Sequence, residues 1–236
     1  MTTTDNTLDF STCTVADLAL QFPQAVAIFN TYYLDYCCHG KTPFVQACEE
    51  AGLNPHKIWQ EIMETKFIQE PKSRMRFENW DAPLLIDYIN QNHHTYVREA
   101  IPQIKELLNK IAEVHGTDSP YVLTVRDTFF ALAEELLNHL PKEEEILFPA
   151  ILRLQKSDNR KEVAASVQFP ISVMEHEHDH AGDLIKSLRT LTSHYTPPAS
   201  ACPTFQFTYK MLQEFDEDLM QHIHLENNIL FPKAKL

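Results

Sequence analysis

The sequence contains few glycines and no long hydrophobic run. Only 4 of its 236 residues are glycine, whereas 14 are proline, and a chain so poor in glycine lacks the residues that tight hairpin turns need. No stretch approaches the length of about 18 apolar residues that indicates a membrane span. The N-terminal residues MTTTDNTLDF also lack the basic and apolar regions of a secretory signal. We therefore expect an all-α, cytoplasmic protein with no membrane partner.

Basic residues are also scarce. The chain has 20 Lys and Arg against 33 Asp and Glu, which gives a formal net charge of −13. An acidic surface repels phosphate backbones, so we expect no nucleic-acid partner. The 5 cysteines are an odd number without the regular spacing of a disulfide scaffold, and we expect them to be free thiols.

Two regions follow one another along the chain. Residues 1–72 are predicted to form a small helical N-terminal domain, in which Thr14 with Asp17 resembles a capping box. The polar segment 69–74 predicts a linker. From residue 80 to residue 236, amphipathic patterns predict four long helices, at 82–114, 120–156, 170–193 and 203–231. Helices of this length joined by short loops favour an antiparallel four-helix bundle.

The bundle region contains a repeated motif, His-x3-Glu-x2-Ile-Leu-Phe-Pro, which begins at His139 and again at His222. A further histidine precedes each copy at a similar distance. His94 lies 45 residues before His139, and His178 lies 44 residues before His222. Each half is therefore a helix pair with one histidine on its first helix and a His-x3-Glu pair on its second. Two such halves facing each other would bring four histidines and two glutamates into the bundle core.

These six side chains are suited to a pair of metal ions. Residues four apart share one face of a helix, so His139 with Glu143, and His222 with Glu226, can each bind one cluster. Imidazole and carboxylate suit iron, with manganese and zinc less favoured. Two octahedral metals offer about 12 positions, of which the six side chains fill about eight and a bridging oxo group about two. About one position per metal remains for a small ligand.

Several motifs resemble the repair-of-iron-centres family, the di-iron iron-sulfur cluster repair proteins of the ScdA/YtfE type, whose bundle is hemerythrin-like. The resemblance covers nearly the whole chain. The motifs run from Asp35 through Cys37 and Cys38 to Lys41, from Lys142 to Pro149, from Ile171 to Asp179, and from Leu225 to Pro232. The resemblance implies two non-haem iron ions, bridged by oxo and carboxylate groups, with ligands at His94, His139, Glu143, His178, His222 and Glu226.

The resemblance also implies a function. Proteins of this type repair iron-sulfur clusters damaged by nitrosative or oxidative stress, so this chain would donate iron, handle nitric oxide, or do both. Its partners would be damaged or apo iron-sulfur proteins, with nitric oxide or dioxygen as small ligands, and a homodimer is a further option. The residues leave open whether the metal site also catalyses a reaction, for example the reduction of nitric oxide.

Other functions compete with this one. A hemerythrin-type protein that binds or senses oxygen or nitric oxide is the main alternative, because the open metal position suits both. A ferritin-like oxidase needs Glu-x-x-His on two separate helices, whereas Glu175-x-x-His178 and Glu177-x-x-His180 overlap on one. A helical interaction module would carry no metal.

Some details of the metal site stay open at the level of sequence. The apolar stripe of the first long helix is centred nearer His93, whereas the family pattern favours His94. Pro141 lies inside the His139 to Glu143 turn, where we expect a kink. Carboxylates that could orient His139 and His222 lie one turn before each, at Glu135 and Asp218, and Glu177 and Asp179 flank His178. Histidines two residues from a proposed ligand should face solvent, namely His176, His180 and His224.

The adjacent Cys37 and Cys38 are the second candidate site. Neighbouring Cα atoms are about 3.8 Å apart, which is below the usual range for a disulfide. We therefore expect two thiols, or a strained bond that reduces easily. Redox chemistry, thiol delivery and iron capture are all open roles, and a pair of buried packing thiols is the alternative. Three further cysteines are interpreted as packing residues, at positions Cys13, Cys48 and Cys202.

Overall fold

The computed structural model describes residues 10–65, 75–157 and 160–235. Helices are the only regular elements in those ranges, and an isolated bridge joins Thr14 to Pro43. The chain divides into two compact units, Met1–Asn79 and Trp80–Leu236. The expected linker at 69–74 lies outside the described residues.

The first unit is a cluster of short helices. It comprises η1 (Phe10–Thr12), α1 (Val15–Gln21), α2 (Pro23–Tyr32), α3 (Phe44–Glu50), α4 (Pro55–Glu64) and η3 (Phe77–Asn79). The expected capping box is confirmed, since the Thr14 hydroxyl accepts the Asp17 N–H and the Asp17 carboxylate accepts the Thr14 N–H. The loop that joins α2 to α3 carries the cysteine pair.

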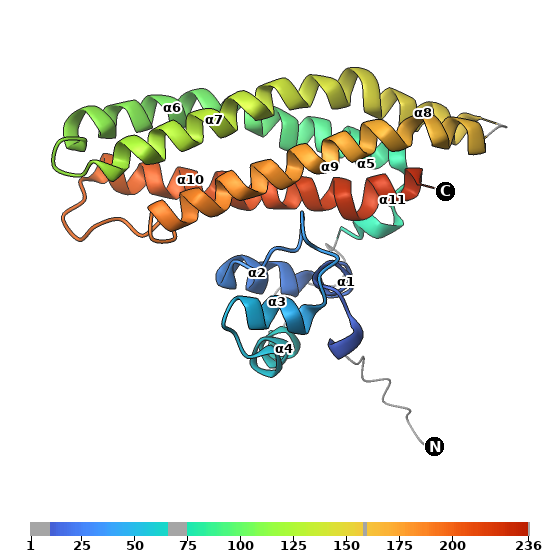
Figure 1. Cartoon of the computed structure of the whole chain (residues 1–236), viewed down its shortest axis with the longest axis horizontal. Helices are drawn as coiled ribbons and strands as arrows, with labels where there is room; N and C mark the ends of the chain where they lie inside the picture. The colour runs from blue at the N-terminus through green and yellow to red at the C-terminus, as the bar shows by residue number, and fades with distance from the viewer. Residues whose placement is uncertain (1–9, 66–74, 158–159, 236) are drawn as a thin grey trace. The chain divides into compact units, whose positions relative to one another are not determined.

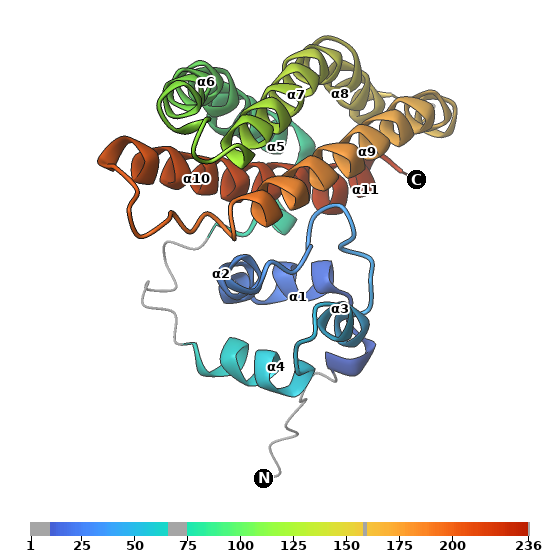
Figure 2. The ribbon, with the colours of Figure 1, turned by 60° about the vertical axis from the view of Figure 1, so that its left-hand side comes forward.

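The second unit is the expected four-helix bundle (Figures 1 and 2). Its elements are α5 (Ala82–Tyr88), η4 (Ile89–His94), α6 (Thr95–His115), α7 (Tyr121–Lys142), η5 (Glu143–Leu147), α8 (Phe148–Lys156), α9 (Arg160–Leu191), α10 (Pro203–Leu225), η6 (Glu226–Leu230) and α11 (Phe231–Ala234). Three of the four rods are composite: α5, η4 and α6 form the first, α7, η5 and α8 the second, and α10, η6 and α11 the fourth. In the bundle, α6 packs against both α7 and α10, and α7 packs against α9.

The third rod, α9, begins earlier than the sequence predicts. It starts at Arg160 and not at residue 170, so that Pro170 lies inside the helix. An interior proline removes one backbone hydrogen bond and usually ends a helix. Here Val167 and Ile171, on either side of the proline, are both fully buried. Packing of that apolar face therefore stabilises the helix enough for it to continue past Pro170.

The composite rods each widen to a π turn. The Phe148 N–H donates to the Glu143 carbonyl, and the Phe231 N–H donates to the Glu226 carbonyl, both five residues back. The distortion expected at Pro141 is therefore present as η5, but Pro141 does not explain it, because η6 widens equally and has no proline at the corresponding position. Both copies share the final proline of Ile-Leu-Phe-Pro, whose ring crowds the carbonyl four residues before it. Both wide turns are thus followed at once by this shared proline.

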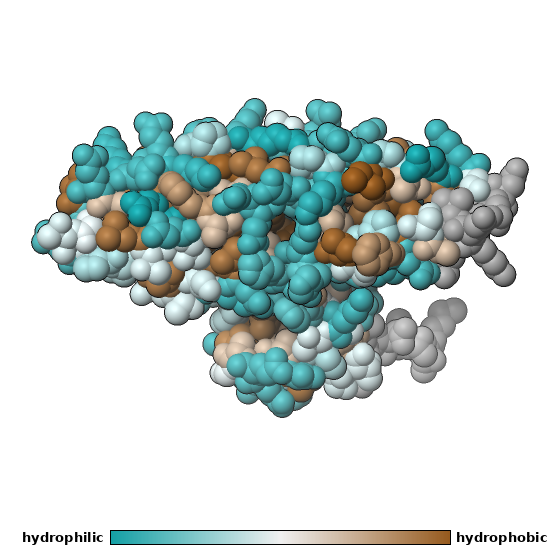
Figure 3. All heavy atoms as spheres, turned by 45° about the horizontal axis from the view of Figure 1, so that its top comes forward, coloured by the Kyte–Doolittle hydropathy of each residue, from teal (hydrophilic) through white to brown (hydrophobic). Residues whose placement is uncertain are grey.

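Hydrophilic side chains cover most of the face shown in Figure 3, and the hydrophobic residues on it are scattered among them. Among the described residues, no helix combines the length and the apolar character needed to cross a membrane. The helices of the second unit bury their apolar faces against one another. Large side chains such as Phe129, Phe148 and Phe215 are fully buried in this core.

A buried ion pair joins α9 to α10. The Arg189 guanidinium donates to both Asp216 carboxylate oxygens, over 2.7 and 2.6 Å, and the Tyr195 hydroxyl donates to the same carboxylate over 2.8 Å. All three residues are buried. The aspartate therefore relies on these donors in place of water.

Replacing the guanidinium should destabilise the bundle strongly. Arg189→Leu leaves the Asp216 charge buried without its cation, and we expect the free energy of unfolding to fall by about 3–5 kcal/mol. Tyr195→Phe removes one hydrogen bond and should cost about 1 kcal/mol. Urea denaturation followed by circular dichroism measures both. Equal losses in the two variants would contradict this account.

Candidate metal centre

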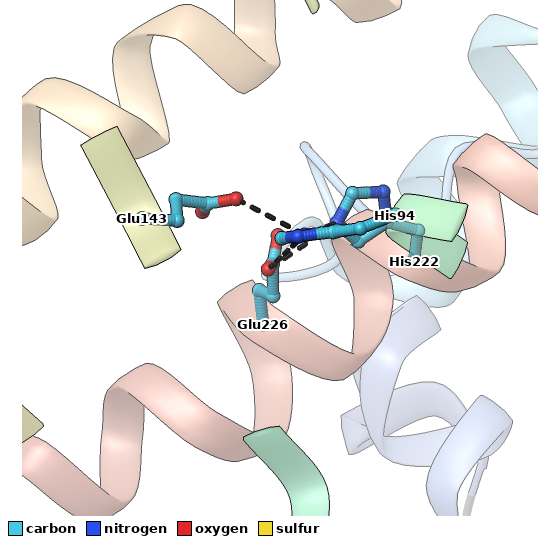
Figure 4. Close-up of side chains that lie close together, drawn as sticks. All are labelled: His94, Glu143, His222 and Glu226. Atoms are coloured by element: carbon cyan, nitrogen blue, oxygen red, sulfur yellow. Dashed lines mark hydrogen bonds and ion pairs between the residues drawn. The ribbon is translucent and has the colours of Figure 1, made fainter. Parts of the chain in front are cut away.

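Six buried side chains converge in the second unit. They come from η4 (His94), α7 (His139), η5 (Glu143), α9 (His178), α10 (His222) and η6 (Glu226), and each is at most 3% exposed. They form two groups of four whose ligand atoms all lie within 4.8 Å of one another: His94, Glu143, His222 and Glu226, and His139, Glu143, His178 and Glu226. Both glutamates belong to both groups. Figure 4 shows the first group, with its side chains directed at one another.

The distances inside the groups match those between ligands of one metal ion. Within each repeated pair, His139 Nε2 lies 3.2 Å from Glu143 Oε2, and His222 Nε2 lies 3.2 Å from Glu226 Oε1. Across helices, His178 Nε2 lies 3.3 Å from Glu226 Oε2. Neighbouring ligands of an octahedral ion with bonds of about 2.1 Å are about 3 Å apart. The cluster therefore has the dimensions of a metal coordination sphere.

The facing imidazole nitrogens are well placed to bind a cation between them. His139 Nδ1 lies 2.7 Å from a Glu177 carboxylate oxygen and His178 Nδ1 lies 2.9 Å from the Asn227 side-chain oxygen, so each Nδ1 carries the proton that it donates. Each Nε2 then has a lone pair, yet the two Nε2 atoms are 3.0 Å apart. Two lone pairs at this distance repel each other. A metal ion bound to both nitrogens removes the repulsion.

The carboxylates are also well placed to bind a cation. None of the four oxygens of Glu143 and Glu226 accepts a hydrogen bond from the described residues, although all are buried. A buried carboxylate without a donor or a cation is strongly destabilising. The residues therefore fit a pair of metal ions, each next to two imidazoles and both carboxylates.

The electrostatics of the site reflect this demand for positive charge. Burial lowers the pKa of His94 and His139, but the nearby glutamates outweigh it and raise these pKa values to about 10 and about 9. Burial raises the pKa of Glu143, and the repulsion from Glu226 raises it further, but the histidines outweigh both and lower it to about 2. Burial likewise opposes ionisation of Glu226, and its histidine neighbours still hold its pKa well below the usual range.

Two carboxylates from neighbouring helices orient the imidazoles. Glu144 lies 2.7 Å from His94 Nδ1. It also accepts hydrogen bonds from both terminal nitrogens of the Arg98 guanidinium, over 2.8 and 2.9 Å. Glu177 holds His139 and accepts the Lys142 ammonium over 2.5 Å. Each group of four thus contains one imidazole backed by a carboxylate that is paired with a basic side chain.

The carboxylates expected in this role are different ones, and that prediction is wrong. Glu135 contacts the exposed His180 at 2.7 Å, and Asp218 contacts His93 Nδ1 at 2.9 Å. The Nδ1 atom of a ligand points away from the cluster towards the next helix, so its partner comes from that helix and not from one turn earlier on its own. The sequence suggested that Glu177 orients its neighbour His178, but its carboxylate contacts His139 Nδ1 instead. Glu144 was missed, although its position next to Glu143 was the available signal.

The ambiguous first histidine is explained by the π turn. His93 and His94 are both buried in η4, because the wide turn presents two successive side chains to the core. Only His94 joins a group of four. The His93 ring is stacked parallel to the His222 ring, with 5.6 Å between centroids.

Of the three histidines expected to face solvent, His176 and His180 are exposed and His224 is not. His224 is only 5% exposed, and its Nδ1 lies 3.1 Å from the Asn228 amide nitrogen. The prediction for His224 is wrong because α10 is covered on all sides at its end. Every residue from 222 to 227 is buried.

The cysteine pair belongs to the first unit. Cys37 is buried and Cys38 half-buried, with Sγ atoms 3.4 Å apart, and neither forms a disulfide. Cys13 and Cys48 are buried as expected, whereas Cys202 is partly exposed.

A cavity of about 310 Å³ adjoins the second group of four. Its lining includes two of the proposed ligands, His139 and His178, together with Glu177 and Lys142. The cavity is large enough for a diatomic molecule beside the imidazoles.

Comparisons with known proteins agree with this geometry. Residues 86–234 match the hemerythrin HHE cation binding domain, and residues 11–66 match the ScdA N-terminal domain, a domain of unknown function (DUF542). The chain belongs to the hemerythrin HHE family. Its relatives include proteins named as iron-sulfur cluster repair proteins.

Relatives in this group match over almost their full length. The chain is 40% identical to the iron-sulfur cluster repair protein YtfE of Musicola paradisiaca, over 93% of this chain and 95% of the relative. It is 36% identical to a probable iron-sulfur cluster repair protein of Haemophilus influenzae, over 96% and 98%. It is 38% identical to YtfE of Escherichia coli O81, over 93% and 95%.

Separate alanine substitutions of Glu177 on α9 and Glu135 on α7 should distinguish the roles of these two carboxylates. Glu177→Ala removes the carboxylate that orients His139, so metal affinity should fall by about 10- to 100-fold. Glu135→Ala is the control, because Glu135 contacts only exposed His180 among the described residues, and affinity should stay unchanged. Metal competition against a chelating dye measures both. A larger loss for Glu135→Ala would reverse the assignment.

Proposed function

We propose that residues 80–236 form a hemerythrin-like domain that holds two non-haem iron ions, and that the protein repairs iron-sulfur clusters damaged by nitrosative or oxidative stress. His94 and His222 would bind one iron, and His139 and His178 the other. Glu143 and Glu226 would bridge the two, together with an oxo group. The small unit at residues 1–72 would form a separate domain.

The proposal of two metal ions rests on the two carboxylates that both groups of four share. Each group of four has its own two histidines, whereas Glu143 and Glu226 occur in both. A single ion would leave one pair of facing imidazoles without a cation. Two ions, each with two nitrogen and two carboxylate oxygen ligands, use every donor in the cluster.

The charge of the cluster supports a role in iron donation. Four neutral imidazoles and two carboxylates contribute about two negative charges, so two ferrous ions would leave a net charge of about +2. Glu144 and Glu177 add nothing to this balance, since Arg98 and Lys142 neutralise them. Metal sites that are rich in carboxylates surround a divalent cation with more anionic ligands than this site does. This site should therefore release ferrous iron more readily than such a carboxylate-rich site.

The surroundings of the centre suit small ligands and protein clients. Bound iron would supply both a transferable ion and an open position for nitric oxide or dioxygen. The cavity between α7 and α9, lined in part by His139 and His178, would give such molecules room next to two of the proposed ligands. Relatives of this chain are named as iron-sulfur cluster repair proteins, and damaged or apo iron-sulfur proteins in the cytoplasm are the corresponding clients.

The iron content of two matched histidine variants tests the centre. The wild-type chain, purified without oxygen, should hold about two irons, because each group of four supplies about four of the six positions of one octahedral ion. His222→Ala removes a buried ligand and should lose one or both. His176→Ala changes an exposed histidine two residues from His178 and should lose neither. Metal analysis with a visible spectrum measures this, and a single zinc in the wild type would refute the di-iron centre.

Iron transfer tests the function. The reduced protein should deliver iron to an apo iron-sulfur protein faster than the oxidised, oxo-bridged form, because it lacks the bridging anion. Recovery of the client's activity after nitric oxide damage is the readout, with the His222→Ala and His176→Ala chains as the matched pair. Reversible oxygen binding, with both irons kept against chelators for hours, would instead favour the carrier or sensor alternative.

A further inference from the structure

Figure 2 shows the course of the loop that joins α2 to α3. Backbone hydrogen bonds within this loop converge on one carboxylate. Asp35 Oδ1 accepts three successive backbone N–H groups, from Cys37, Cys38 and His39, over 3.2, 3.0 and 3.2 Å. His39 Nδ1 lies 2.8 Å from the other oxygen, Oδ2. These contacts fix the conformation of the loop, and with it the directions of the two cysteine side chains.

Both thiols are directed to the same place as a result. The two Sγ atoms are 3.4 Å apart, and Cys37 Sγ is also 3.4 Å from Asp35 Oδ1. One ligand atom from each of Asp35, Cys37 and Cys38 lies within 4.8 Å of the others. With metal–sulfur bonds of about 2.3 Å, the sulfur separation corresponds to an angle of about 95° at a shared ion. The pair can therefore chelate one metal ion without a change of backbone.

The environment of Cys37 argues against a role as a reactive nucleophile. Its side chain is buried, and burial, followed by the neighbouring Cys38 and Asp35, raises the pKa of its thiol. Reactive cysteines have lowered pKa values and lie in electropositive, accessible sites. A bound cation would add positive charge beside these three side chains.

We infer that Asp35, Cys37 and Cys38 form a second cation site, distinct from the centre in the bundle, for a divalent ion of borderline softness such as zinc or ferrous iron. Thiolate sulfur with carboxylate oxygen is a donor set that such ions accept. Binding breaks two S–H bonds, forms two metal–sulfur bonds and releases two protons to solvent, with no transfer of electrons.

The site would be suited to exchange. Three protein ligands leave the fourth position of a tetrahedral ion open, and Cys38 and Asp35 are only half-buried. His39 is exposed and holds the Asp35 carboxylate in place. Zinc should bind more tightly than ferrous iron at equilibrium, in the general order for such donors.

Cobalt titration of the reduced, metal-free full-length chain tests the inference. Thiolate ligands give Co²⁺ an intense near-ultraviolet charge-transfer band, which the His and Glu ligands in the bundle cannot produce. Because the two proposed positions in the bundle also take up cobalt, we expect this band to saturate by about three equivalents of added cobalt. Cys37→Ser and Cys38→Ser should each weaken cobalt binding at this site by at least about tenfold, and Cys202→Ser is the matched control with no change.

Asp35→Asn separates the ligand role of the carboxylate from its role in the loop. The amide oxygen can still accept the three N–H groups but carries no charge, so affinity should fall by about tenfold or more. Unchanged affinity would remove Asp35 from the site. Absence of the band in the wild type, or its persistence in a chain with both Cys37→Ser and Cys38→Ser, would overturn the proposal.

A measurement on the wild-type chain covers the case in which a cysteine variant does not fold. Added zinc should slow alkylation of Cys38 at least tenfold, as mapped by mass spectrometry, and leave alkylation of Cys202 unchanged. Equal alkylation of Cys38 with zinc and with a chelator would refute the site. Neither result depends on the iron content of the bundle, so failure here leaves the di-iron proposal intact.

Discussion

Two buried carboxylates without hydrogen-bond donors are the constraint on which the second unit depends. Glu143 and Glu226 face each other's histidines in the middle of an apolar bundle, where unneutralised charge is very costly. Positive charge must therefore be present for the bundle to keep both ionised. Metal ions supply it at fixed positions, so we expect metal binding and the stability of this unit to be closely linked.

The backbone is adapted to the same constraint. Each of the two glutamates begins a π turn, and His94 ends another. Such turns are rare and often mark functional sites. In this protein a proline shared by both copies of the motif, Pro149 and Pro232, follows two of them. The two halves are not identical, however, because His178 Nδ1 faces an amide and His222 Nδ1 has no partner among the described residues. We expect the two metals to differ in affinity.

Much of this arrangement could be predicted from the sequence, because the repeat combines with helical periodicity. His-x3-Glu pairs and their partner histidines indicate which six residues converge, and the structure places all six together. Contacts between helices were harder to predict. Glu144 and Glu177 orient histidines on other helices, so spacing along one helix pointed to Glu135 instead. Similarly, the choice between His93 and His94 depended on a π turn, which shifts the 3.6-residue period, and His224 was misplaced because neighbouring elements cover α10 near its end.

The central claim is that two iron ions share both carboxylates. Diffraction from crystals of the iron-loaded chain, recorded on either side of the iron absorption edge, locates each ion directly. The account predicts two anomalous peaks between Glu143 and Glu226, one beside His94 and His222 and the other beside His139 and His178. A single peak, or peaks that lie away from both glutamates, would contradict it.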